Sequence, residues 1–71
     1  MLNVYVKQNE LKKVMFIKGF NMLDLSINAE VSTTYLSQIV NGKKTPSSKI
    51  AKKIADALDV EIVDIFEIQF I

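Results

Sequence analysis

The sequence predicts a mainly helical single domain over residues 1–71, with five helices and a short strand at each end. Three observations lead to this fold class. Apolar residues between residues 10 and 66 recur every three or four positions, as they do on the buried face of a helix. Residues that begin or end helices, above all Asn21, Ser32 and Asn41-Gly42, divide this stretch. The two ends, LNVYV and FEIQFI, are β-branched and aromatic or alternate in polarity, which is typical of strands.

Residues 2–6 form the first expected strand, and a helix is expected over residues 10–18. Leu11, Val14, Met15 and Lys18 follow the i, i+3, i+4, i+7 spacing of one helical face. Asn9 is a candidate cap for the start of this helix. Gly19 can end it, because glycine adopts the left-handed conformation without strain.

Two further helices are expected on either side of a brief turn. Asn21 is a candidate N-cap for the helix over residues 22–30, in which the carboxylate of Asp24 meets the positive end of the helix dipole. Ser32 is a candidate cap for the third helix, from Thr33 to about Val40, and Asn41-Gly42 ends that helix.

The remaining chain predicts a loop, a fourth helix and a final strand. Pro46 lies in the loop KKTPSS, before a helix over residues 47–58 with apolar residues at three- and four-residue spacing. The stretch EIVDIF, residues 61–66, is a short fifth helix or a turn, and FEIQFI is a strand. The end strands, each marginal alone, can pair antiparallel with each other or between two copies. The sequence does not separate these two arrangements.

The composition excludes several classes of site. The chain has no cysteine and no histidine, so disulfides and the usual zinc and iron–sulfur sites are ruled out, and we expect no metal and no cofactor. A domain of this size buries only about 60% of its unfolded surface. Stability must therefore come from apolar packing, alone or shared with a second copy. The same composition lacks a phosphate-binding glycine loop and catalytic pairs, so we do not expect an enzyme.

The chain carries no membrane or export signal that the sequence can reveal. No apolar run approaches the roughly 20 residues that span a bilayer. The first ten residues, MLNVYVKQNE, lack the basic segment and apolar core of a secretory signal. We therefore expect a cytoplasmic protein without a membrane partner.

The charges are unevenly distributed, although the net charge is only +1. Residues 1–53 hold all nine lysines and three acidic residues, whereas residues 54–71 hold five acidic residues and no lysine. Such asymmetry suggests a polyanion as the partner of one face. On charge alone, an ordinary solvated surface explains it equally well.

The order of helix, short turn and helix within residues 21–41 is the geometry that places a second helix in the major groove of DNA. Its first residues, Ser32, Thr33 and Thr34, would meet base edges, with Gln38 one turn further on. Threonine can hydrogen-bond and touch a thymine methyl, and glutamine can pair with adenine. Lys43 and Lys44 would hold phosphates from the loop. Each of these residues also has an ordinary structural role, as a cap or a solvated side chain.

The segment Asn21–Phe66 resembles the Cro and phage-repressor type of helix-turn-helix protein, the XRE family. The matching motifs, LDLSINAEVSTTYLSQIVNGKKTPS and KIAKKIADALDVEIVDIF, cover about two-thirds of the chain in order and spacing. The resemblance implies a repressor-like fold that binds operators, usually as a dimer, to regulate transcription. It implies base-reading positions at Thr33, Thr34 and Gln38. The implied DNA-backbone positions are Ser32, Asn41 and Lys43, to which we add Tyr35 and Lys44. The implied core positions are Leu25, Val31, Leu36, Ile39, Ile50, Ile54, Ala55, Leu58 and Ile65.

The sequence departs from the family pattern at a few positions. Met22 stands where the family commonly has a phosphate-binding glutamine. Glu30 stands at a turn position that often holds glycine, so either it accepts a left-handed backbone at a cost on the order of 1 kcal/mol, or the turn differs slightly. Ser26 replaces a small alanine. The chain has no arginine, so bidentate guanine recognition through a guanidinium is not available.

We therefore expect a sequence-specific double-stranded DNA-binding transcriptional regulator, a repressor of phage or mobile-element type. It would act as a homodimer, at least on a pseudo-palindromic operator, without a small-molecule ligand. Two alternatives stay open: an antitoxin of a toxin–antitoxin pair, and a protein-interaction module that keeps the fold without DNA binding. The operator sequence, activation against repression, and the dimer surface also stay open.

Overall fold

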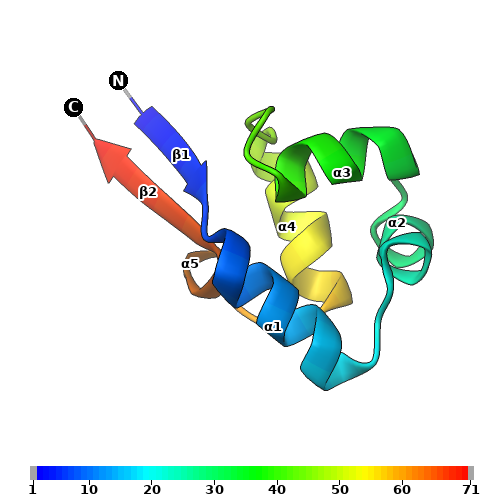
Figure 1. Cartoon of the computed structure of the whole chain (residues 1–71). Helices are drawn as coiled ribbons and strands as arrows, with labels where there is room; N and C mark the ends of the chain where they lie inside the picture. The colour runs from blue at the N-terminus through cyan, green and yellow to red at the C-terminus, as the bar shows by residue number, and fades with distance from the viewer. Residues whose placement is uncertain (1, 71) are drawn as a thin grey trace.

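Five α-helices and two strands make up residues 2–70, the part of the chain that the computed structural model describes (Figure 1). The elements in order are β1 (Leu2–Val6), α1 (Gln8–Lys18), α2 (Met22–Ala29), α3 (Thr33–Val40), α4 (Ser48–Ala57), α5 (Ile62–Ile65) and β2 (Phe66–Phe70). The expected class, mainly helical with a short strand at each end, is confirmed. No helix within residues 2–70 has the length and apolar character to cross a membrane.

The core lies between the five helices and the base of β2. Its buried apolar residues are Leu11, Met15, Leu25, Ala29, Leu36, Ile39, Val40, Ala51, Ile54, Ala55, Leu58, Ile65 and Phe66. Seven of the nine core positions that the sequence predicted are among them. The other two, Val31 and Ile50, are half-buried and pack against this core. The three- and four-residue spacing thus marks the buried face of each helix.

Side chains cap three of the helices, at Asn21 and Ser32 as the sequence predicted and at Ser47, which the sequence placed inside the fourth helix. At the start of α2, the Asn21 carbonyl oxygen Oδ1 accepts from the Asp24 N–H at 2.7 Å, and the Asp24 carboxylate accepts from the Asn21 N–H at 3.2 Å. Ser32 caps α3 and Ser47 caps α4 through their hydroxyl oxygens. These bonds satisfy N–H groups that the first turn of a helix leaves without partners.

The predicted cap at Asn9 is wrong. α1 begins at Gln8, two residues before the expected start at residue 10, and Asn9 lies exposed in its first turn. The start of α1 is set by contacts with α5 instead: the Lys7 N–H donates to the Ile65 carbonyl, and the Lys7 Nζ donates to the Val63 carbonyl, both at 2.9 Å. These partners lie more than fifty residues away in sequence, so local pattern could not indicate them.

Three helices end in a common way, with a left-handed residue followed by an apolar residue. The left-handed residues after α1, α2 and α4 are Gly19, Glu30 and Asp59, with φ of 74°, 59° and 57°. The apolar residues that follow them are Phe20, Val31 and Val60. Each donates its N–H to a helix carbonyl five residues back, and each packs against the core. The helix carbonyls are thereby satisfied, and the chain turns back towards the core.

The two strands pair within the chain, which decides between the arrangements that the sequence left open. β1 and β2 are antiparallel, with Leu2 opposite Phe70, Val4 opposite Ile68 and Val6 opposite Phe66. Figure 1 shows this ribbon running away from the helices. The expected second strand also included Ile71, which lies outside the described residues. The stretch over residues 61–66 is a one-turn helix, α5, that leads directly into β2.

Candidate nucleic-acid interface

The helix pair α2 and α3 places α3 along the outer edge of the helical body (Figure 1). Leu36, Ile39 and Val40 bury one side of α3 against the core. The turn between the two helices depends on Glu30, whose left-handed backbone allows the Val31 N–H to donate to the Ser26 carbonyl at 3.0 Å. Because the apolar side is buried, the remaining polar side of α3 is presented outwards.

The leading edge of α3 carries three exposed hydroxyl residues, Ser32, Thr33 and Thr34. The Ser32 Oγ accepts from the Tyr35 N–H at 3.1 Å, so the predicted cap is confirmed. A hydroxyl group that accepts one hydrogen bond still carries a hydrogen that it can donate. Capping the helix and donating to an external acceptor are therefore compatible at Ser32.

Gln38 lies one turn after Thr34 and is half-buried. Since residues four apart share one face of a helix, Gln38 continues the side of α3 on which Thr34 lies. Its backbone carbonyl accepts from the N–H groups of both Lys43 and Lys44, at 2.8 and 3.2 Å. The loop therefore folds back onto the end of α3, which brings the two exposed lysines beside that helix.

Lys44 is held close to Tyr35. Its ammonium nitrogen lies 5.8 Å from the centroid of the Tyr35 ring, within the range of a cation–π interaction. Tyr35 is half-buried and packs against the core, so its ring provides a fixed base for the lysine. The sequence did not indicate this contact, because it depends on how the loop turns rather than on helical spacing.

Asn41 is engaged by its own helix. Its side-chain amide donates to the Ser37 carbonyl at 2.9 Å and to the Ser37 hydroxyl at 3.3 Å. The side-chain amide of Asn41, a predicted DNA-backbone contact, is therefore already hydrogen-bonded to the last turn of α3. Gly42 follows with φ of 76°, a left-handed conformation that favours glycine.

Two departures from the family pattern have clear structural roles on α2. Ser26 is only 3% exposed, and its Oγ donates to the Leu23 carbonyl at 2.7 Å. A polar residue is accepted at this buried position because the helix itself satisfies it. Met22 is half-buried and packs against the core. The position therefore contributes apolar packing, in place of the polar side chain of the family pattern.

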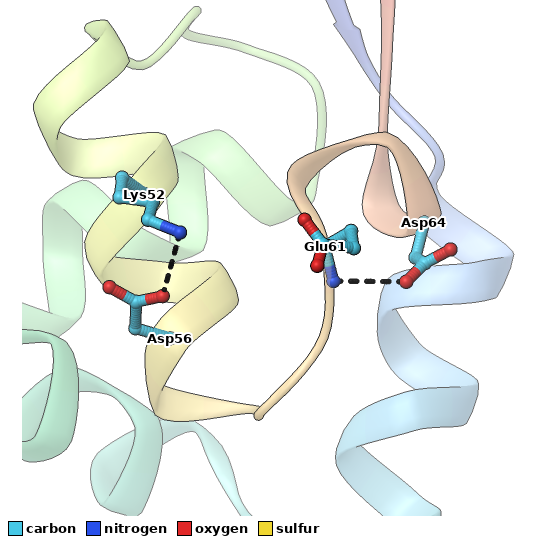
Figure 2. Close-up of polar contacts among 4 residues, drawn as sticks. All are labelled: Lys52, Asp56, Glu61 and Asp64. Atoms are coloured by element: carbon cyan, nitrogen blue, oxygen red, sulfur yellow. Dashed lines mark hydrogen bonds and ion pairs between the residues drawn. The ribbon is translucent and has the colours of Figure 1, made fainter.

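Acidic residues gather at the far end of α4, away from the loop that carries Lys43 and Lys44. Figure 2 shows Lys52 paired with Asp56 at 3.2 Å and the Glu61 N–H donating to the Asp64 carboxylate at 3.0 Å. These residues line a hollow of about 320 Å³. Within residues 2–70, no group of three or more acidic residues is placed to hold a metal ion. Lys43 and Lys44 thus lie beside α3, whereas Asp56, Glu61 and Asp64 lie around the junction of α4 and α5.

Comparisons with known proteins agree with this arrangement. A family profile described as "Helix-turn-helix" matches residues 18–65. The HTH-type transcriptional regulator SlrR of Bacillus subtilis (strain 168) is 37% identical over 51 residues, which cover 70% of this chain and 34% of SlrR. The uncharacterized HTH-type transcriptional regulator YqaF of the same organism is 30% identical over 67 residues, which cover 94% of this chain and 82% of YqaF. The chain therefore spans about a third of SlrR and most of YqaF.

Two solved structures have a similar fold. The restriction-modification controller protein C.AhdI from Aeromonas hydrophila superposes with a TM-score of 0.74 at 23% identity, over 80% of this chain and 86% of C.AhdI. The clp gene regulator ClgR from C. glutamicum superposes with a TM-score of 0.71 at 28% identity, over 80% of this chain and 74% of ClgR. Because C.AhdI is only 23% identical to this chain, its similarity supports the fold alone. Since the family profile covers well over half of the residues, this chain belongs to the XRE-type helix-turn-helix family of transcriptional regulators.

Proposed function

We propose that this chain is a transcriptional repressor of phage or mobile-element type that binds double-stranded DNA sequence-specifically through α3. The observation that carries the proposal is the outward polar edge of α3, where Thr33 and Thr34 are exposed and Gln38 follows one turn later. A helix presented in this way can enter the major groove, which is wide enough for one helix. Membership of a family of transcriptional regulators supports the same role.

Base recognition is assigned to Thr33, Thr34 and Gln38. The threonine hydroxyls can donate to or accept from base edges, and their methyl groups can contact thymine. The Gln38 amide can form two hydrogen bonds with adenine. Because arginine is absent from the whole sequence, we expect the preferred site to depend more on adenine and thymine contacts than on guanine.

Positioning on the sugar–phosphate backbone is assigned to Ser32, Tyr35, Asn41, Lys43 and Lys44. The two lysines are exposed and lie beside the end of α3, where their charges can neutralise phosphates. Lys44 is restrained by the Tyr35 ring, which lowers the entropy cost of fixing its ammonium group. Asn41 acts through the helix end that it stabilises rather than through a free amide.

We further propose that two copies bind one pseudo-palindromic operator. α3 has only eight residues, so one copy contacts only a few base pairs. A pair of copies related by a two-fold axis reads two half-sites about 10 base pairs apart, or a multiple of that distance. The operator sequence then mirrors the symmetry of the protein.

The proposal is tested by selecting bound duplexes from a random DNA pool and then measuring variants on the selected site. We expect Gln38→Ala to cost about 1–3 kcal/mol on that site and to relax one base position, since one base-reading side chain is lost. Gln69→Ala, on the exposed ribbon, is the matched control and should bind as the parent chain does. A pool without a preferred sequence, or equal weakening of Gln38→Ala on all sequences, would contradict the assignment.

A further inference from the structure

Gln8, the first residue of α1, is a polar residue on the inward face of that helix. Positions three and seven residues apart lie close to one face of an α-helix, so Gln8 shares a face with Leu11 and Met15. Leu11 and Met15 are buried in the core, whereas Gln8 is exposed. A polar side chain thus stands at the end of the apolar face of α1, where that face leaves the core.

The Gln8 side chain lies against the turn that follows α3. A Cβ placed on Gly42 would be 3.0 Å from the Gln8 Nε2 and 3.7 Å from the Val6 Cγ1. The end of β1 and the start of α1 therefore border the loop that carries Lys43 and Lys44 (Figure 1). Gly42 directly precedes Lys43, so the Gln8 amide and the first of the two lysines belong to one small region of the surface.

The backbone beside Gln8 is fixed by residues near the other end of the chain. Lys7, the residue before it, donates its N–H to the Ile65 carbonyl and its Nζ to the Val63 carbonyl, both at 2.9 Å. Gln8 is thereby held beside the turn at Gly42. Within residues 2–70, no group accepts a hydrogen bond from the Gln8 side-chain amide. The position of this residue is therefore set, while its donor group stays available.

The turn itself has few donors left for a ligand. Every backbone N–H group from Asn41 to Lys44 already donates to a carbonyl of α3, and the Asn41 side-chain amide is bonded to Ser37. The donors that remain on the loop side chains are the ammonium groups of Lys43 and Lys44. Lysine is a flexible point charge, which neutralises a phosphate without fixing its direction. The Gln8 amide is thus a free neutral donor at a place where the loop has only mobile charges.

We propose that the Gln8 amide donates to a DNA phosphate beside those that Lys43 and Lys44 neutralise, so that the start of α1 is a further part of the DNA interface. This role rests on the proposed function. Amide side chains are common donors to phosphate oxygens, and such contacts position a protein on the duplex without reading bases. Gln8 therefore adds affinity and fixes orientation, and it leaves the choice of sequence to α3.

The test compares Gln8 with its neighbour Asn9, which is also an exposed amide in the first turn of α1. Asn9 lies about 160° around the helix from Leu11, so it is on the outward side, away from the loop. Alanine, lysine and glutamate are placed at each position in turn. A charge introduced at either position acts alike on the helix dipole and on the net charge of the chain. The measurement is affinity for the selected duplex and for unrelated duplexes at several salt concentrations.

We expect Gln8→Ala to bind all duplexes roughly 5- to 10-fold more weakly, with an unchanged slope of log affinity against log salt. The amide is neutral, so its loss removes a hydrogen bond without changing the number of counterions released. Gln8→Lys should make the slope steeper by about one, because an ammonium group then meets the phosphate. Gln8→Glu should bind more weakly than Gln8→Ala, since its carboxylate repels the phosphate. The matching changes at Asn9 should leave affinity and slope close to those of the parent chain.

Equal effects of the Gln8 and Asn9 variants would overturn the proposal, and so would a Gln8→Lys variant with the slope of the parent chain. A purely structural role of Gln8 would lower the free energy of unfolding in urea but would not make the salt slope steeper in Gln8→Lys. Lys43→Ala, measured in the same series, separates this inference from the proposed function. If Lys43→Ala lowers the slope while the Gln8 variants behave as the Asn9 variants do, the proposed function stands and Gln8 lies outside the interface. A parent chain that binds no DNA would overturn both.

Discussion

Glu30 holds the turn between α2 and α3 in a conformation that glutamate ordinarily avoids. Its φ of 59° and ψ of 41° lie in the left-handed region, which costs a residue with a Cβ roughly 1–2 kcal/mol. Hydrogen bonds and apolar packing on both sides of Glu30 hold it in this conformation. The N–H groups of Glu30 and Val31 donate to helix carbonyls, and Val31 packs on the core. The angle at which α3 leaves α2 therefore depends on a strained residue.

Glu30→Gly should stabilise the chain by roughly 0.5–1 kcal/mol, because glycine relieves the left-handed strain but gains entropy in the unfolded state. The measurement is the free energy of unfolding in urea. The substitution also removes the contact between Glu30 and Lys53, whose charged atoms lie 3.7 Å apart on an exposed surface. Lys53→Ala isolates that contact and should change stability by no more than about 0.5 kcal/mol. A less stable Glu30→Gly variant would contradict the account of the turn.

Helix caps were predicted correctly where the capping side chain and the N–H group that it binds lie close together in the sequence. The caps at Asn21 and Ser32 bond three residues ahead, so the sequence alone contains both partners. The prediction failed at Asn9, because α1 starts where β1 and α5 place Lys7 rather than where a capping side chain occurs. The engagement of Asn41 by Ser37 is local, yet the sequence pattern predicts only a helix end and a phosphate contact at Asn41.

At the scale of elements, α3 and the loop that follows it form one unit. The Gln38 carbonyl receives the N–H groups of both lysines, so the loop is anchored to the helix it follows. Because of this anchoring, a shift of α3 along the major groove of DNA would move Lys43 and Lys44 with it. Base reading and phosphate positioning are thus coupled through the backbone of the chain.

Lys43→Ala should weaken binding to all DNA sequences alike and reduce the slope of log affinity against log salt by about one. The physical reason is that one phosphate contact releases about one counterion. Lys12→Ala removes the same charge from the exposed face of α1 and should leave the slope unchanged. The measurement is fluorescence anisotropy at several salt concentrations. Equal slopes for Lys43→Ala and the parent chain would remove Lys43 from the phosphate contacts.

The helices were predictable as elements, whereas the pairing of the strands was not. Helical spacing repeats within a few residues, so the buried faces of α1 to α4 follow from the sequence. The ends of α4 differ from the expectation only because Ser47 and Leu58 are its caps rather than helical residues. The pairing of Leu2 with Phe70 spans the whole described chain, and strand patterning does not say which strand is the partner.

At the scale of the whole molecule, charge and apolar surface are separated onto different regions. Lys43 and Lys44 lie beside α3, carboxylates surround the end of α4, and the ribbon of β1 and β2, with its exposed Leu2 and Phe70, projects from the helices. The charge asymmetry was visible in the sequence, and so were the candidate base-reading residues. The apolar groove of about 270 Å³ between the ribbon and the start of α4 was not visible in the sequence, because the residues that line it lie at both ends of the chain and in the middle. Only the folded molecule brings Leu2, Ala51 and Ile68 together.

The central claim is that the leading edge of α3 meets DNA, and an NMR titration of the isotope-labelled chain with its selected duplex tests it most directly. Backbone amide signals report contact residue by residue. We predict that the largest changes fall between Ser32 and Lys44, and that the acidic region around Asp56 and Asp64 stays unchanged. Large changes around Asp56 and Asp64, with the signals of Thr33, Thr34 and Gln38 unmoved, would contradict the claim.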